Sequence, residues 1–208
     1  MTGSSTLVLG FLLGLRHATE ADHLVAVATL ATRQAPLFEA LRQGLAWGIG
    51  HTLTLLLVGG TVLALGQALP PRFELLLELA VGLMLIGLGG DVLRRHRIEH
   101  LLHRADRQPP KPLARALLVG SLHGLAGSAA LIALSVGAAV SPSAGLLYIL
   151  LFGLGAMLGM AVLSTLIAVP LQLSAPGLQR LNRTLVLGIG TLSVGLGLLT
   201  TIAIGRQL

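Results

Sequence analysis

The residues of this sequence best suited to chemistry are histidines and carboxylates inside an apolar segment. His17, Glu20, Asp22 and His23 fall within seven residues near the N-terminus. A charged side chain at the centre of a bilayer costs at least about 2.5–3.5 kcal/mol, so ionisable residues there are rare and usually functional. Imidazole nitrogens with a few carboxylate oxygens suit divalent nickel, cobalt, zinc and copper. The segment therefore indicates a site for a transition-metal ion.

Two later apolar segments carry histidines of their own, His51 followed by Thr52, and His123. The chain has no cysteine, which excludes a thiolate site, and an oxygen-only cage for magnesium or calcium would not need histidines. The predicted metal ligands are five side chains: His17, Asp22, His23, His51 and His123. Three further residues are predicted to orient those ligands or to couple ion movement to protons: Glu20, Thr52 and Ser128.

Each histidine also has a structural alternative. A lone histidine in a membrane helix is often a hydrogen-bond partner for a neighbouring helix. That interpretation is strongest for His123 alone and weakest for the cluster around His17 and His23. Arg16 suits a structural role as a partner of Glu20 or of a carbonyl, because it would repel a cation.

The composition requires a membrane scaffold for these residues. Of the 208 residues, 54% are apolar and 11% are charged, against roughly 25% charged in soluble domains. We expect an all-α integral membrane protein in contact with lipid, not an enzyme, in a single membrane domain that covers residues 1–208. Six membrane-spanning helices are predicted: 6–31, 41–66, 73–93, 114–140, 144–171 and 184–205.

Basic residues on alternate connections predict the orientation. Eleven of them fall on one side: Arg33, Arg42, Arg94, Arg95, Arg97, Arg104, Arg107, Lys111, Arg115, Arg180 and Arg183. The other side has two, Arg72 and Arg206. Because cytoplasmic loops carry the excess of basic residues, we expect the cell inner membrane, both termini outside and the 94–113 loop in the cytoplasm. The net charge of +6 then requires no nucleic-acid partner.

The 94–113 loop separates two halves of three predicted helices each, 1–93 and 114–208, which must lie in opposite orientations. Three pairs of segments resemble one another in order: 13–17 and 119–123, 47–50 and 152–155, and 81–89 and 187–197. The pattern predicts a 3+3 inverted repeat, a plan that places transporter sites near the bilayer midplane. At 1.5 Å per residue, His17, His51 and His123 lie about 14–16 Å from the ends of their predicted helices, near that midplane.

The first predicted helix cannot be straight if it holds one ion. On a straight helix Asp22 points about 140° away from His17, so His17, Asp22 and His23 could not all face the same point. Either this helix is broken near the midplane, as in several transporters, or Asp22 orients an imidazole from behind.

A second set of histidines recurs at helical spacing in the predicted cytoplasmic loop: His96, His100 and His103. These side chains could receive metal on the cytoplasmic side. The alternative is a basic surface helix beside anionic lipid.

The segment 16–24, RHATEADHL, resembles the H-x4-D-H signature of the nickel/cobalt transporter family (NiCoT or NicO). The segment 50–52 resembles that family's second histidine motif, and 122–130 resembles the fourth-helix motif of its UreH-like branch, which is linked with nickel supply to urease. The resemblance implies nickel or cobalt as the transported substrate, no bound cofactor, and His17 and Asp22 with His23 as the functional core.

The sequence therefore predicts a permease that moves Ni2+, or Co2+, inward across the cytoplasmic membrane. Two alternatives stay open: a metal exporter on the same scaffold, and a urease or hydrogenase accessory membrane protein without autonomous transport. A second copy of the chain and urease-maturation proteins are the open protein partners. The missing cysteines exclude a thiol electron carrier, and no H-E-x-x-H motif supports a zinc protease.

Overall fold

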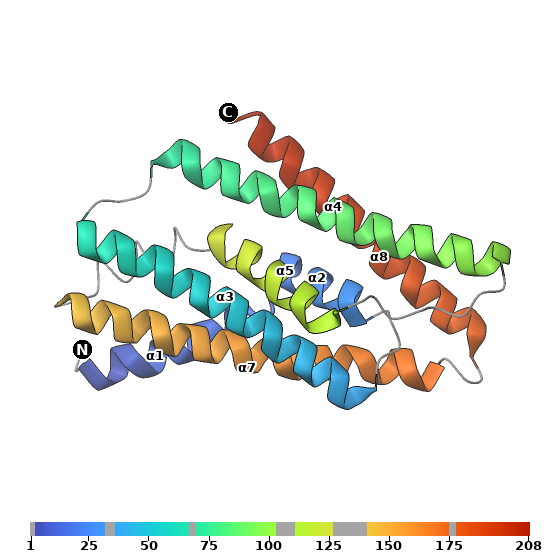
Figure 1. Ribbon diagram of the computed structural model, residues 1–208, viewed down its shortest axis with the longest axis horizontal. Coiled ribbons are helices and arrows are strands. Elements are labelled where there is room, and N and C mark those ends of the chain that lie inside the picture. Colours follow the sequence, from blue (N-terminus) through green and yellow to red (C-terminus); the bar gives the residue numbers. More distant parts are fainter. Residues whose placement is uncertain (1–2, 32–35, 67–69, 103–110, 127–140, 175–177) are drawn as a thin grey trace.

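In the computed structural model, seven helices account for nearly all of the described residues, which are 3–31, 36–66, 70–102, 111–126, 141–174 and 178–208. The helices, labelled as in Figure 1, are α1 (Gly3–His17), α2 (Ala21–Ala31), α3 (Leu37–Leu65), α4 (Pro71–Leu102), α5 (Pro112–Ala126), α7 (Pro142–Ser174) and α8 (Gln179–Gly205). The described part of the chain contains no strand, in agreement with the predicted all-α class.

Four of these helices are long and apolar enough to cross a membrane: α3, α4, α7 and α8. At 1.5 Å per residue a helix of 27 residues is about 40 Å long, more than the hydrocarbon core requires. Their outward faces carry large apolar side chains, among them Leu57, which is 72% exposed, and Leu199, which is 68% exposed. Such faces are expected to lie against lipid, so the chain is a membrane protein.

The predicted count of six helices is not confirmed. The first predicted span, 6–31, is two short helices, α1 and α2, separated at residues 18–20, which agrees with the break predicted in this helix. The fourth predicted span, 114–140, is described as α5 up to Ala126, and its remainder lies outside the described residues.

The predicted end of the third helix at residue 93 is wrong. Helix α4 continues to Leu102, so the first part of the predicted 94–113 loop is helical. The reason is that hydropathy marks where a helix leaves the apolar layer, not where it ends. Arginine, leucine and glutamate favour helix, and no proline or glycine follows Gly90 before Pro109.

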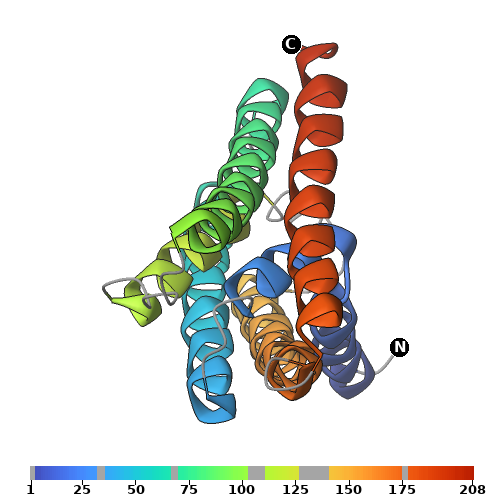
Figure 2. The ribbon, with the colours of Figure 1, turned by 90° about the vertical axis from the view of Figure 1, so that its right-hand side faces the viewer.

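Two pairs of long helices form the frame of the molecule. Helix α3 packs against α7, and α4 packs against α8. The short α2 contacts α4, α7 and α8, and the short α5 lies between α3 and α4 (Figures 1 and 2). At the basic end of α4, Asp91 accepts a hydrogen bond from Arg115 of α5 at 3.0 Å, which ties the two helices together.

Glycines let the short helices α1 and α5 pack closely against α7 and α3, and each of these two crossings has a glycine on both helices. A Cβ atom at Gly14 of α1 would overlap the backbone of Phe152 on α7, while one at Gly155 would overlap the backbone of Phe11. Helix α5 meets α3 in the same way. There, Cβ atoms at Gly120 and Gly50 would overlap the backbones of Trp47 and Leu117, respectively. Small residues at such crossings are how membrane helices reach close packing.

Candidate metal site

The structure brings four histidines to one place, each from a different helix. His17 ends α1, His23 lies in the first turn of α2, and His51 and His123 lie on α3 and α5. The ring centroids of His17 and His23 are 4.3 Å apart, and those of His23 and His123 are 3.9 Å apart. His51 lies 5.4 Å from both His17 and His23 by the same measure. His23, His51 and His123 are at most 1% exposed, so the cluster is inside the protein.

The break between α1 and α2 makes this convergence possible. The Thr19 hydroxyl donates to the Arg16 carbonyl at 2.6 Å, and the amides of Thr19 and Glu20 donate to carbonyls three residues earlier. These tight turns end α1 and redirect the chain into α2. On a continuous helix, His17 and His23 would be separated by about 9 Å along the axis.

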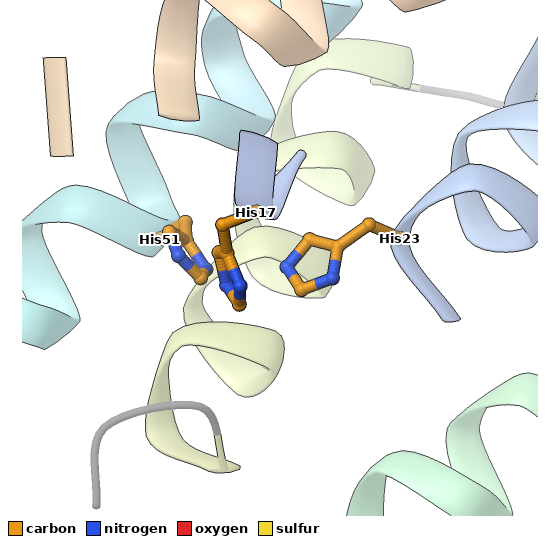
Figure 3. A group of neighbouring side chains, drawn as sticks. All are labelled: His17, His23 and His51. Atoms are coloured by element: carbon orange, nitrogen blue, oxygen red, sulfur yellow. The ribbon is translucent and has the colours of Figure 1, made fainter. Parts of the chain in front are cut away.

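Three of the rings form a ligand group with open nitrogens. One ligand atom each from His17, His23 and His51 lie within 4.8 Å of one another, and Figure 3 shows the rings gathered with a nitrogen of His23 facing the other two. The Nε2 atoms of His17 and His23 and both nitrogens of His51 are buried with no hydrogen-bond partner among the described residues. Because unpaired buried polar atoms are costly, their convergence indicates a site that binds something.

Carboxylates stand behind two of these rings. His23 Nδ1 donates to Asp22 Oδ1 at 3.2 Å, and His17 Nδ1 lies 3.0 Å from Glu20 Oε2. In each ring the nitrogen on the far side, Nε2, is the free one. A carboxylate on one imidazole nitrogen fixes the ring and makes the other nitrogen a better metal ligand. Glu20 thus contacts His17 as Asp22 contacts His23, and a role of Glu20 in orienting a ligand stays a prediction.

A second ligand group shares His23 with the first. Asp22, His23 and His123 also offer ligand atoms within 4.8 Å of one another. Here Asp22 is engaged on both oxygens, because His123 Nε2 donates to Oδ2 at 2.8 Å. The five predicted metal ligands are therefore neighbours, but they divide into two groups of three.

Two aromatic residues that the sequence analysis did not single out form walls of the site. The Trp47 ring lies parallel to that of His23, with centroids 6.2 Å apart, and 5.8 Å from that of His123. The Phe152 ring lies 5.2 Å from that of His17. A signal was present, since Trp47 is the only tryptophan and occupies the position of Phe152 in the paired segments 47–50 and 152–155.

The remaining predicted residues lie apart from the cluster or outside the described residues. The Thr52 hydroxyl lies 2.7 Å from the Gly48 carbonyl and 3.0 Å from the Gly153 carbonyl, so it joins α3 to α7. His96 and His100 lie on α4, and within the described residues His96 belongs to neither ligand group. Ser128 and His103 lie outside the described residues.

Fold and site together define an all-helical membrane protein with a buried histidine–carboxylate cluster. No family model and no solved structure matches the chain. Among curated proteins, the urease accessory protein UreH of Bacillus sp. (strain TB-90) is 39% identical over 181 residues, which cover 82% of this chain and 79% of the relative. The chain therefore belongs to the nickel/cobalt transporter family, in its UreH-like branch. The relative is named an accessory protein and not an enzyme, in line with the expectation from the sequence.

Proposed function

We propose that this protein is a permease that moves Ni2+, with Co2+ as a second substrate, inward across the cytoplasmic membrane. The observation that carries the proposal is the group formed by His17, His23 and His51. Three imidazoles from three helices, two of them buried and His17 11% exposed, gather unpaired buried nitrogens in one place, and two of the rings are backed by carboxylates. Borderline divalent ions prefer such ligands, and the family and the name of the relative favour nickel among them.

The scaffold we propose is a 3+3 inverted repeat with the site between its halves. The support is an exchange of contacts at the helix crossings: equivalent residues of the two halves each meet the other half in the same way. Gly14 meets Phe152, and its counterpart Gly120 meets Trp47, the counterpart of Phe152. Such an exchange is what a twofold relation between two halves would produce, and transporters built in this way bind substrate between the halves.

The orientation we propose follows the distribution of basic residues, with both termini outside. Helix α1 would then enter from outside and α5 from the cytoplasm. Their histidine-bearing ends meet at the cluster, where His17 and His123 both contribute rings. A potential of 100 mV contributes about 2.3 kcal/mol per charge, or about 4.6 kcal/mol for a divalent ion. That energy supports accumulation of about a thousandfold without ATP.

The test is uptake of radioactive nickel by proteoliposomes that contain only this protein, with an inside-negative potential. We expect uptake by the wild type, competition by cobalt, and loss of uptake in His51→Ala. The matched control is His96→Ala, which removes a histidine outside both ligand groups. Uptake by the purified protein that follows the inside-negative potential would support the permease.

A second candidate is an accessory role without autonomous transport, which the name of the relative, urease accessory protein, favours. In that case the purified protein would bind nickel in detergent but would not move it in proteoliposomes. Binding without uptake, with both insertion orientations present, would overturn the permease in favour of this role.

A further inference from the structure

We infer that a transported ion occupies two positions in succession and that His23 belongs to both. The first position is formed by His17, His23 and His51, and the second by Asp22, His23 and His123. This inference rests on the proposed function, since it describes how the same site would pass its substrate on.

Distances favour two positions over a single site with five ligands. A metal–imidazole bond is about 2.0–2.1 Å long, so two ligands of one ion lie at most about 4.2 Å apart. Each group of three gathers its ligand atoms within 4.8 Å, which small side-chain movements would close around an ion. No larger group in the described part of the chain meets that limit, and the rings of His51 and His123 have centroids 6.5 Å apart.

His23 is suited to link the positions because its two nitrogens serve different groups. Its Nε2 is unpaired and faces His17 and His51 (Figure 3). Its Nδ1 donates to Asp22, whose other oxygen is held by His123. An ion bound on Nε2 is therefore separated by one imidazole ring from the carboxylate that would receive it next.

The two groups also differ in how readily an ion could enter them. The first presents unpaired nitrogens, whereas the second is closed by two hydrogen bonds to Asp22, of 3.2 and 2.8 Å. An ion can enter the first group without breaking a hydrogen bond. To enter the second it must displace both, and the protons on His23 Nδ1 and His123 Nε2 must move to the other nitrogen of each ring, which is unpaired. His17 ends the short helix α1 and His123 lies near the end of the short helix α5. In the proposed orientation, transfer between groups thus moves the ion from the outer short helix to the inner one.

The experiment compares His51→Gln with His123→Gln in two assays, nickel affinity in detergent and nickel uptake in proteoliposomes. Glutamine at 123 can still donate a hydrogen bond to Asp22, but its amide is a much poorer ligand than imidazole. We expect His51→Gln to lose at least tenfold in affinity and to lose uptake. We expect His123→Gln to keep its affinity within about threefold while its uptake rate falls at least tenfold.

Two results would overturn the inference. Near wild-type uptake in His123→Gln would mean that His123 only orients Asp22, and a loss of affinity equal to that of His51→Gln would mean one joint site. His123→Asn provides a second amide should the glutamine variant fail to elute as the folded protein. A wild type without uptake would instead overturn the proposed function, so the two failures are distinguishable.

Discussion

The crossing of α1 with α7 and the crossing of α5 with α3 pack alike, but the short helices in them carry different chemistry. Gly14 and Gly120 stand in equivalent places at the crossings, each against the backbone of an aromatic residue. The polar residues of the cluster are unequal, because residues 1–93 contribute three histidines and two carboxylates, while residues 114–208 contribute His123. All eight acidic residues of the chain precede residue 107. Similar packing thus brings both sets of residues to one place, where their chemistry differs.

The largest effect is expected from removing His23, the one ligand that both groups share. His23→Ala should reduce nickel uptake to background and lower affinity by at least about a hundredfold, since it also leaves Asp22 without one of its partners. Uptake and equilibrium binding measure this effect, with His96→Ala as control. Retention of more than a tenth of wild-type uptake would show that His23 is dispensable and that the first half does not supply the site.

The two carboxylates of the first half should differ in importance. Asp22 contacts both His23 and His123, whereas Glu20 contacts His17 alone, with its own side chain 58% exposed. Loss of a carboxylate behind a ligand imidazole costs 10–100-fold in affinity. We expect Asp22→Asn to fall in that range and Glu20→Gln to lose about threefold or less, since an exposed contact is weak. Nickel titration of both proteins measures the difference, and equal losses would contradict the unequal roles.

Substitution of the equivalent glycines Gly14 and Gly120 by alanine should destabilise the protein equally. In Gly14→Ala and Gly120→Ala a methyl group meets backbone atoms of the facing helix, and overpacking of this kind costs about 1–3 kcal/mol. For a chain of this size we expect thermal unfolding in detergent to shift down by about 2–10 °C in both variants. Gly188→Ala is the control, because no atom lies within 4 Å of its added methyl group. A large shift in one variant alone would contradict equivalent crossings.

The smallest effect is expected at His96, outside the compared segments. His96→Ala should keep nickel affinity and uptake within about threefold of wild type, because His96 shares no ligand group with the cluster in the described residues. The uptake assay checks this expectation. A tenfold loss of affinity or uptake would instead support the prediction that the histidines of α4 receive metal.

The sequence predicted which histidines lie together better than it predicted the extents of the helices that carry them. The break in the first helix followed from side-chain directions, since His17 and Asp22 could not face one point on a straight helix. The continuation of α4 past residue 93, as far as Leu102, did not follow, because apolar content does not report how far a helix extends beyond the apolar layer.

Division of the ligands into two groups could not be predicted from spacing. It depends on how closely α5 approaches α3, which the glycines at their crossing allow, and on the resulting approach of His123 to His23 of α2. The same is true of Trp47, whose place beside His23 and His123 depends on three helices meeting. The position of the Thr52 hydroxyl could not be predicted either, because its hydrogen bond to the Gly153 carbonyl depends on how α3 packs against α7, and its role at the site stays a prediction.

The most direct test of the account is X-ray absorption spectroscopy of the nickel-loaded protein, wild type against His51→Gln. The account predicts imidazole scattering from His17, His23 and His51 around the nickel of the wild type, with one imidazole fewer in the variant. Nickel surrounded by oxygen ligands alone, or a spectrum unchanged by the substitution, would contradict the claim that these histidines bind the substrate.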